Sequence, residues 1–130
     1  MRLKDRIAVV TGGGTGIGRA IALLFAREGA AVVVNYAHSK DAAEDAVREV
    51  EAAGGCARAF RADVSREAEA KAMFAGVEAR WGGLDVLVNN AGWSTRVPHH
   101  KLEDLTDEIW DRTLNTNLRG AFYCVRAAVP

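Results

Sequence analysis

The chain has 130 residues, of which 49% are hydrophobic, and its 17 basic residues are balanced by 17 acidic ones. This length suits a single domain, and the lack of net charge argues against nucleic acid or an acidic membrane surface as a partner. We expect a soluble cytoplasmic protein without a leader or membrane segment, in which Cys56 and Cys124 are buried thiols that form no disulfide.

The first predicted elements are an apolar strand, Ile7 to Val10, and an amphipathic helix, Arg19 to Glu28. The turn that joins them, residues 11 to 18, reads TGGGTGIG. A strand, a tight glycine turn and a helix in this order present unpaired N–H groups and a positive dipole end to a pyrophosphate. We therefore predict a dinucleotide site here, and a glycine-rich turn without a ligand is the alternative.

Three glycines of this turn have separate expected functions. Gly12 allows the sharp turn, Gly16 lets the backbone approach the phosphates, and Gly18 lets the helix lie close to the strand. The candidate cofactor-binding residues of this segment are Gly12, Gly14, Thr15, Gly16, Ile17 and Gly18.

Strands and helices continue to alternate along the chain. The further strands are predicted at Ala31 to Asn35, Ala57 to Arg61 and Leu84 to Asn89, and the helices at Asp41 to Ala53 and from an N-cap at Ser65 to Gly82. Such alternation predicts an α/β fold, a Rossmann-type doubly wound parallel sheet with helices on both faces. We expect the strand order third, second, first, fourth, with the cofactor across the carboxyl ends. A loop from Trp93 to Lys101 follows, then helical stretches at Leu102 to Trp110 and from about Asn115.

The end of the second strand bears on the choice of cofactor. Sheets that bind NAD usually carry an acidic residue there, which pairs with the ribose hydroxyls. Asn35 stands at that position and Tyr36 follows it, with His38, Ser39 and Lys40 beyond. NADP is therefore favoured and NAD is the alternative.

Four motifs in register resemble the short-chain dehydrogenase/reductase family. They are TGGGTGIG at 11 to 18, Asp63-Val64, Asn89-Asn90-Ala91-Gly92, and the segment NTNLRG at 115 to 120. The resemblance extends over the whole chain and is greatest to 3-oxoacyl-carrier-protein reductases and glucose 1-dehydrogenases.

The resemblance implies a function for each motif. Asp63 would contact the adenine and Val64 would pack against its ring, although Asp63 could instead only prepare the helix start at Ser65. Asn90, Ala91 and Gly92 would line the ribose beside the nicotinamide, Asn89 would tie the fourth strand to its neighbours, and Asn117 would be the catalytic asparagine.

The reaction implied is hydride transfer between a nicotinamide and a carbonyl or alcohol carbon, with a small-molecule substrate that the sequence does not identify. The serine, tyrosine and lysine of the family would come after Pro130, so we expect residues 1–130 to be one incomplete, amino-terminal domain, inactive alone. The resemblance also implies a homo-oligomer, a tetramer in the full-length family. A noncatalytic dinucleotide-binding module is the alternative.

Two further patterns are not expected to carry chemistry. Tyr36 and Lys40 match the spacing of the family's catalytic tyrosine and lysine but lie at the adenosine end. His99 and His100 adjoin each other in a loop without nearby ligands, so no metal site is predicted.

Overall fold

The computed structural model describes residues 1–129, and within them four parallel strands form one sheet in the order β3-β2-β1-β4. The strands are β1 (Ile7–Val10), β2 (Ala31–Tyr36), β3 (Cys56–Arg61) and β4 (Val86–Val88). This is the strand order that the sequence predicts. Val10 is in register with Val34 and with Val88, so the carboxyl ends of β1, β2 and β4 reach the same edge of the sheet.

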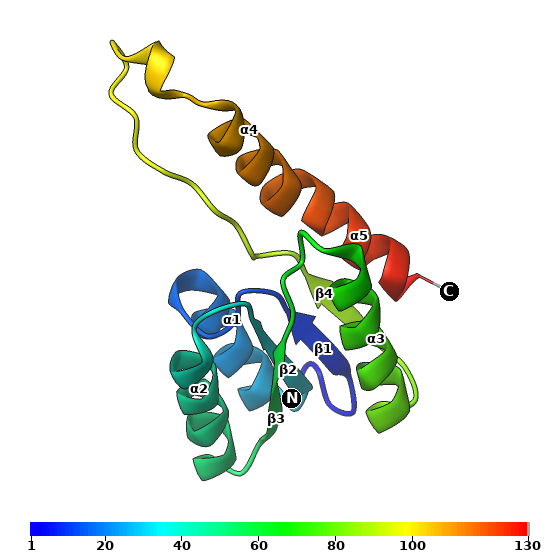
Figure 1. Cartoon of the computed structure of the whole chain (residues 1–130). Helices are drawn as coiled ribbons and strands as arrows, with labels where there is room; N and C mark the ends of the chain where they lie inside the picture. Colours follow the sequence, from blue (N-terminus) through cyan, green and yellow to red (C-terminus); the bar gives the residue numbers. More distant parts are fainter. Residues whose placement is uncertain (130) are drawn as a thin grey trace.

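Helices cover both faces of the sheet. Figure 1 shows α1 and α2 on one side and α3 and α5 on the other. The helical segments are α1 (Gly16–Arg27), α2 (Lys40–Ala52), α3 (Glu67–Trp81), η1 (Leu102–Asp104), α4 (Asp107–Leu114), η2 (Asn115–Arg119) and α5 (Gly120–Ala128). The doubly wound Rossmann architecture predicted from the alternation of elements is confirmed.

The strand side chains alternate between two cores, because successive residues of a strand point to opposite faces. Val9 and Val33 pack with Met73, Phe74 and other residues of the α3 face. The other core consists of Ala8, Val10, Ala22, Ala30, Val32, Val34, Ala43 and Ala46, on the α1 and α2 face. Both faces of the central strands are therefore buried, which explains their nearly continuous apolar sequence.

The helices α1 and α3 end close to the predicted positions, Glu28 and Gly82, and a glycine follows each of them. Gly29 has φ 97° and Gly82 has φ 82°, and this left-handed backbone favours glycine. Gly18 and Ala22 are the buried residues of α1, whereas Ile17 in its first turn is 74% exposed.

The start of α3 is also corrected. The helix begins at Glu67 with Arg66 at its N-cap, so Ser65 lies before the cap. Glu69 accepts a hydrogen bond from the Asp63 N–H at 3.0 Å, and this contact organises the entry into the helix.

The segments α4, η2 and α5 form one run of helix with a π-helical centre at η2. Figure 1 shows α4 and the loop before it extending away from the sheet, while α5 lies beside α3. Arg126 of α5 pairs with Glu67 of α3 at 2.6 Å, and Gly120 packs so closely on Val64 that an added Cβ would lie 2.9 Å from its Cγ2. These contacts fix the α5 end of the run to the sheet.

The two cysteines have different environments, against the expectation that both are buried. Cys56 is exposed because it begins β3, a strand at the edge of the sheet. Cys124 is fully buried, and burial raises the pKa of its thiol to about 11. Among the described residues, no helix has both the length and the apolar character needed to cross a lipid bilayer.

Candidate functional site

The glycine turn folds back on the ends of β2 and β4. Gly12 adopts φ 61°, and an added Cβ would lie 3.1 Å from the Ala91 Cα. At Gly18 an added Cβ would collide with the Gly12 carbonyl and with the Asn90 amide. Gly12 and Gly18 therefore permit the close approach of turn, helix and β4 that the sequence predicts.

The start of α1 is open. Thr15 stands at the N-cap, but its side chain makes no capping hydrogen bond. Gly16 has φ 54°, and an added Cβ would meet nothing within 4 Å. The first N–H groups of a helix have no acceptor within the helix, so this open end, with its positive dipole, suits a phosphate group.

Asn35 is 1% exposed, and its side chain is committed to the fold. Its Oδ1 accepts from the Gly12 N–H at 3.2 Å, and its Nδ2 donates to the carbonyl oxygens of Phe60 and Ala62 at 3.2 and 3.1 Å. The amide thus joins the glycine turn to β3. The next residue, Tyr36, is half-buried and ends β2, so Tyr36 and the residues after it are the ones at this strand end that can contact a cofactor.

Asp63 follows β3 and is held by Ser65, whose N–H and hydroxyl donate to its Oδ1 at 3.0 and 2.6 Å. Partial burial raises the pKa of Asp63, but the two hydrogen bonds and the positive charges of Arg66 and His38 outweigh it. The pKa of this carboxyl therefore lies below its ordinary value, and Asp63 is ionised at neutral pH. The structural function that the sequence left as an alternative is present, since these bonds shape the turn before α3.

Asn90 and Thr11 connect β4 to the glycine turn. The Asn90 amide donates to the carbonyls of Thr11 and Gly12, both at 3.1 Å. Thr11 is buried, and its hydroxyl accepts from the N–H groups of Asn90 at 3.0 Å and Ala91 at 2.9 Å while donating to the Val88 carbonyl. Asn89, which was expected to connect β4 to its neighbours, is exposed, and the side chain of Asn90 makes these hydrogen bonds instead.

Asn117 lies in the π-helical η2 and is paired with Trp93. Its Oδ1 accepts from the Trp93 N–H at 2.7 Å, and its Nδ2 donates to the Trp93 carbonyl at 2.8 Å. The same Oδ1 would lie 3.0 Å from a Cβ added at Gly92. Asn117 thereby fixes the loop after β4 against the long helix, and π-helical segments often occur at functional sites.

A cavity of about 480 Å³ brings most of the predicted cofactor residues together at the carboxyl ends of the strands. The predicted residues that line it are Gly12, Gly14, Thr15, Asn35, Tyr36, Asp63, Val64, Ala91 and Gly92. Gly16 and Ile17 lie outside the lining, at the exposed start of α1, whereas Gly18, Asn90 and Asn117 contact residues that line it. The cavity lies where ligands bind in open α/β sheets.

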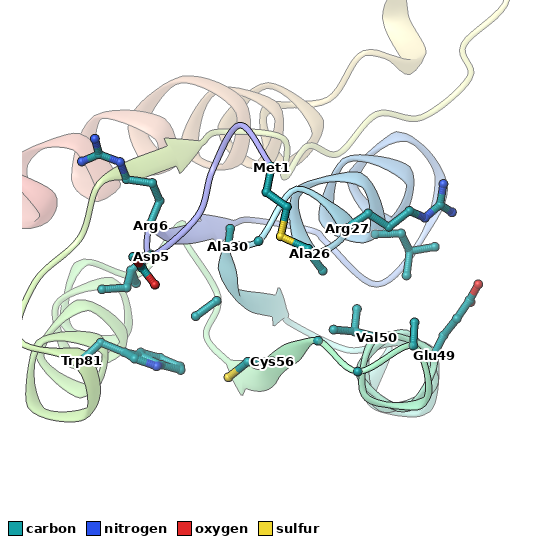
Figure 2. A pocket seen from close by; sticks show the side chains of 17 residues that line it. Met1, Asp5, Arg6, Ala26, Arg27, Ala30, Glu49, Val50, Cys56 and Trp81 are labelled. Carbon is teal, nitrogen blue, oxygen red and sulfur yellow. The ribbon is translucent and has the colours of Figure 1, made fainter.

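A larger hollow of about 850 Å³ lies at the opposite edge, where β1, β2 and β3 begin. Figure 2 shows Cys56, Trp81, Met1 and Arg27 around it. None of the predicted cofactor residues lines this hollow. Its position at the amino ends of the strands separates it from the nucleotide site predicted here.

The remaining sequence patterns are placed as follows. Tyr36 ends β2 and Lys40 begins α2, so they do not share a helix, and Lys40 pairs with Glu44 at 3.8 Å. His99 and His100 are exposed in the loop before η1. Within residues 1–129, no three His, Cys, Asp or Glu side chains gather in a way that could hold a metal ion.

Two residues of the site, Arg112 and Thr11, were not predicted from the sequence to have a function there. Arg112 lines the cavity together with Asn115 and Thr116 of the next helical turn, and its guanidinium lies 4.1 Å from the centre of the Trp93 ring. The spacing of three and four residues would have placed the three on one helical face, had α4 and η2 been predicted as one helix. For Thr11, the signal was its position at the end of a buried strand, where a hydroxyl must find partners.

Known proteins that are similar to this chain in sequence or in structure are short chain dehydrogenases and reductases. A family model described as short chain dehydrogenase matches residues 6–130. A short chain dehydrogenase/reductase, nsrJ, from Aspergillus novofumigatus is 46% identical over 127 residues, which are 98% of this chain and 47% of that protein. A 3-oxoacyl-[acyl-carrier-protein] reductase, FabG, from Staphylococcus aureus is 47% identical over 123 residues, which are 95% of this chain and 49% of that protein.

Among solved structures, a short chain dehydrogenase from Burkholderia cenocepacia in complex with NADP superposes with a TM-score of 0.92 at 40% identity. The match covers 98% of this chain and 51% of that one. A short-chain dehydrogenase/reductase mutant from Serratia marcescens superposes with a TM-score of 0.91 at 38% identity. The chain spans about half the length of the curated relatives it matches.

Proposed function

The chain belongs to the short-chain dehydrogenase family, and from this premise we propose that it binds NADP(H) in an oxidoreductase that interconverts a carbonyl and an alcohol. The observation that carries the proposal is the open start of α1 beside a cavity at the carboxyl ends of the strands. Five separate segments of the chain line this cavity, and an extended ligand such as a dinucleotide can contact several of them at once. When bound, the nicotinamide supplies the hydride.

The glycine turn and the start of α1 hold the pyrophosphate. The Gly12 N–H already donates to the Asn35 side chain. The N–H groups of Gly16 and Ile17, at the start of α1, are therefore the donors for the phosphates. Asp63 and Val64 hold the adenine from the end of β3, where Asp63 is ionised and able to accept hydrogen bonds. Ala91 and Gly92 lie beside the nicotinamide ribose, where their small size leaves room for the sugar.

Asn117 acts as a positioning residue. Its paired hydrogen bonds to Trp93 hold the loop that contains Gly92 against the long helix. The ribose side of the cavity is thereby kept in one shape. A loop fixed in this way loses less conformational freedom on binding than a mobile one.

NADP is the cofactor we propose in preference to NAD. Among the described residues that line the cavity, Asp63 is the one carboxylate, and it follows β3 rather than β2. The end of β2 offers Tyr36, His38 and Ser39, which contain no group that repels a 2′-phosphate. The relative from Burkholderia cenocepacia, whose solved structure contains NADP, agrees with this preference.

The substrate is a small molecule with a carbonyl or an alcohol, and the reductases of 3-oxoacyl groups among the relatives make an acyl carbonyl the first to test. A homo-oligomer is proposed as well. Large apolar side chains are exposed at intervals of three or four residues along the long helix: Trp110, Leu114, Leu118, Phe122 and Val125. A second copy would bury such side chains.

Calorimetric titration with NADPH and NADH tests the function directly. Saturable binding that is tighter for NADPH is expected, and it should be lost in Gly16→Val, because a side chain there blocks the phosphates. Gly54→Val is the matched control, since Gly54 also has a positive φ (87°) and open space around it but lies at the opposite edge of the sheet. If both variants bind like the wild type, or if the folded wild type binds neither nucleotide, the proposal is wrong.

A further inference from the structure

We propose that Arg112 binds the pyrophosphate of the dinucleotide from the helical side of the cavity, across from the glycine turn. The inference rests on the proposed function and adds to it a cationic ligand that the glycine turn lacks. Backbone N–H groups and a helix dipole supply only partial positive charges. A guanidinium supplies a full charge and a planar pair of donors that fits phosphate oxygens.

The position of Arg112 is the first argument. It lies in the last turn of α4 and lines the cavity with Asn115, Gly92 and Trp93. Gly12, Gly14 and Thr15 of the glycine turn line the same cavity. A phosphate group held by that turn therefore shares the cavity with the Arg112 guanidinium.

The pairing of Arg112 is the second argument. Arg66, the other arginine in the lining, lies 4.0 Å from Asp63 and 3.7 Å from Glu69. Arg112 enters none of the ion pairs formed by residues 1–129, although Glu108 lies one helical turn before it. A cation without a carboxylate partner in the wall of a cavity is available to an anionic ligand.

The contact with Trp93 is the third argument. The Arg112 guanidinium carbon lies 4.1 Å from the centre of the Trp93 ring. An arginine over an aromatic face keeps the N–H groups in its plane free to donate. Trp93 is itself held by Asn117 through both backbone groups, so Arg112 is preorganised before any ligand arrives.

The experiment is calorimetric titration of the full chain with NADPH and with NADH, using the wild type, Arg112→Gln, Arg112→Lys and Arg119→Gln. Arg119 is the matched control, because it is an exposed arginine on the same run of helix but does not line the cavity. Circular dichroism and urea unfolding of each variant check that the fold is retained.

Arg112→Gln is expected to weaken both nucleotides by the same factor, roughly tenfold, as for the loss of one charged phosphate contact. Arg112→Lys should recover part of the affinity, and Arg119→Gln should leave it unchanged. Equal affinities for the wild type and Arg112→Gln, or a loss confined to NADPH, would overturn the pyrophosphate assignment while the proposed function stands. No binding by the folded wild type would overturn both.

Discussion

Replacement of Thr11 by valine removes a buried hydroxyl without changing the shape of the side chain. The hydroxyl accepts from the N–H groups of Asn90 and Ala91 and donates to the Val88 carbonyl. The Asn90 N–H also donates to the Val88 carbonyl at 3.1 Å, so valine deprives the Ala91 N–H of its hydrogen bond and leaves the Asn90 N–H with the weaker half of a shared one. The variant therefore tests whether this one oxygen holds β4 to the glycine turn.

The expected loss is about 1–3 kcal/mol in the free energy of unfolding, which is the cost of one buried donor left without a partner. That donor is the Ala91 N–H, because the Asn90 N–H keeps the Val88 carbonyl as an acceptor. A domain has only about 5–15 kcal/mol of stability in total, so the change is large.

Urea unfolding followed by circular dichroism measures this loss, and Thr11→Ser is the matched control. Serine keeps the hydroxyl and removes one methyl group, which costs about 1 kcal/mol. If Thr11→Val unfolds within about 0.5 kcal/mol of the wild type, or if Thr11→Ser is the less stable of the two, the reasoning is refuted.

Three further predictions concern separate parts of the chain. Gly54→Ala should lower the free energy of unfolding by about 1 kcal/mol, the cost of a left-handed backbone alone. Gly29→Ala should lower it more, because the added Cβ would also lie 2.9 Å from the Lys4 Cα, and thermal unfolding of both variants measures the difference. A thiol reagent at pH 8 should modify Cys56 at once and Cys124 only on unfolding, since burial raises the pKa of the Cys124 thiol to about 11; equal rates would contradict this. The pKa of Asp63 is lowered in the folded chain, so its ionised form stabilises the fold above the unfolded pKa of about 3.9, and this contribution is lost as the pH falls. The difference in the free energy of unfolding between the wild type and Asp63→Asn should therefore shrink below about pH 4, as measured by acid unfolding.

Local signals in the sequence predicted the parts of the fold that depend on local backbone. The helices α1 and α3 end close to the predicted positions, because Gly29 and Gly82 supply the left-handed backbone that is favoured after the last turn. The strand order followed from the alternation of elements, which allows few arrangements. These features need no knowledge of distant contacts.

The hydrogen bonds of Asn35 and Asn90 depend on distant contacts, and the sequence did not predict them. The Asn35 amide joins the glycine turn to β3. Asn89 and Asn90 are adjacent and have the same side chain, and the positions of Thr11 and Gly12, which are far away in the sequence, decide that Asn90 is the bonded one. Arg112 was not predicted because it falls between the two predicted helical stretches. A single predicted helix would have placed Arg112 and Asn115 on one face.

The π-helical segment η2 makes the chain sensitive to changes in length. Each residue of an α-helix turns the side-chain direction by about 100°, and a π-helical turn holds an additional residue. Deleting one residue from 115–119 would therefore rotate α5 by about that angle relative to α4. Arg112 and Gly120 could then no longer face the cavity and Val64 at the same time. Substitutions on the outer side of this segment should be tolerated, whereas insertions and deletions of single residues should be strongly disfavoured in evolution.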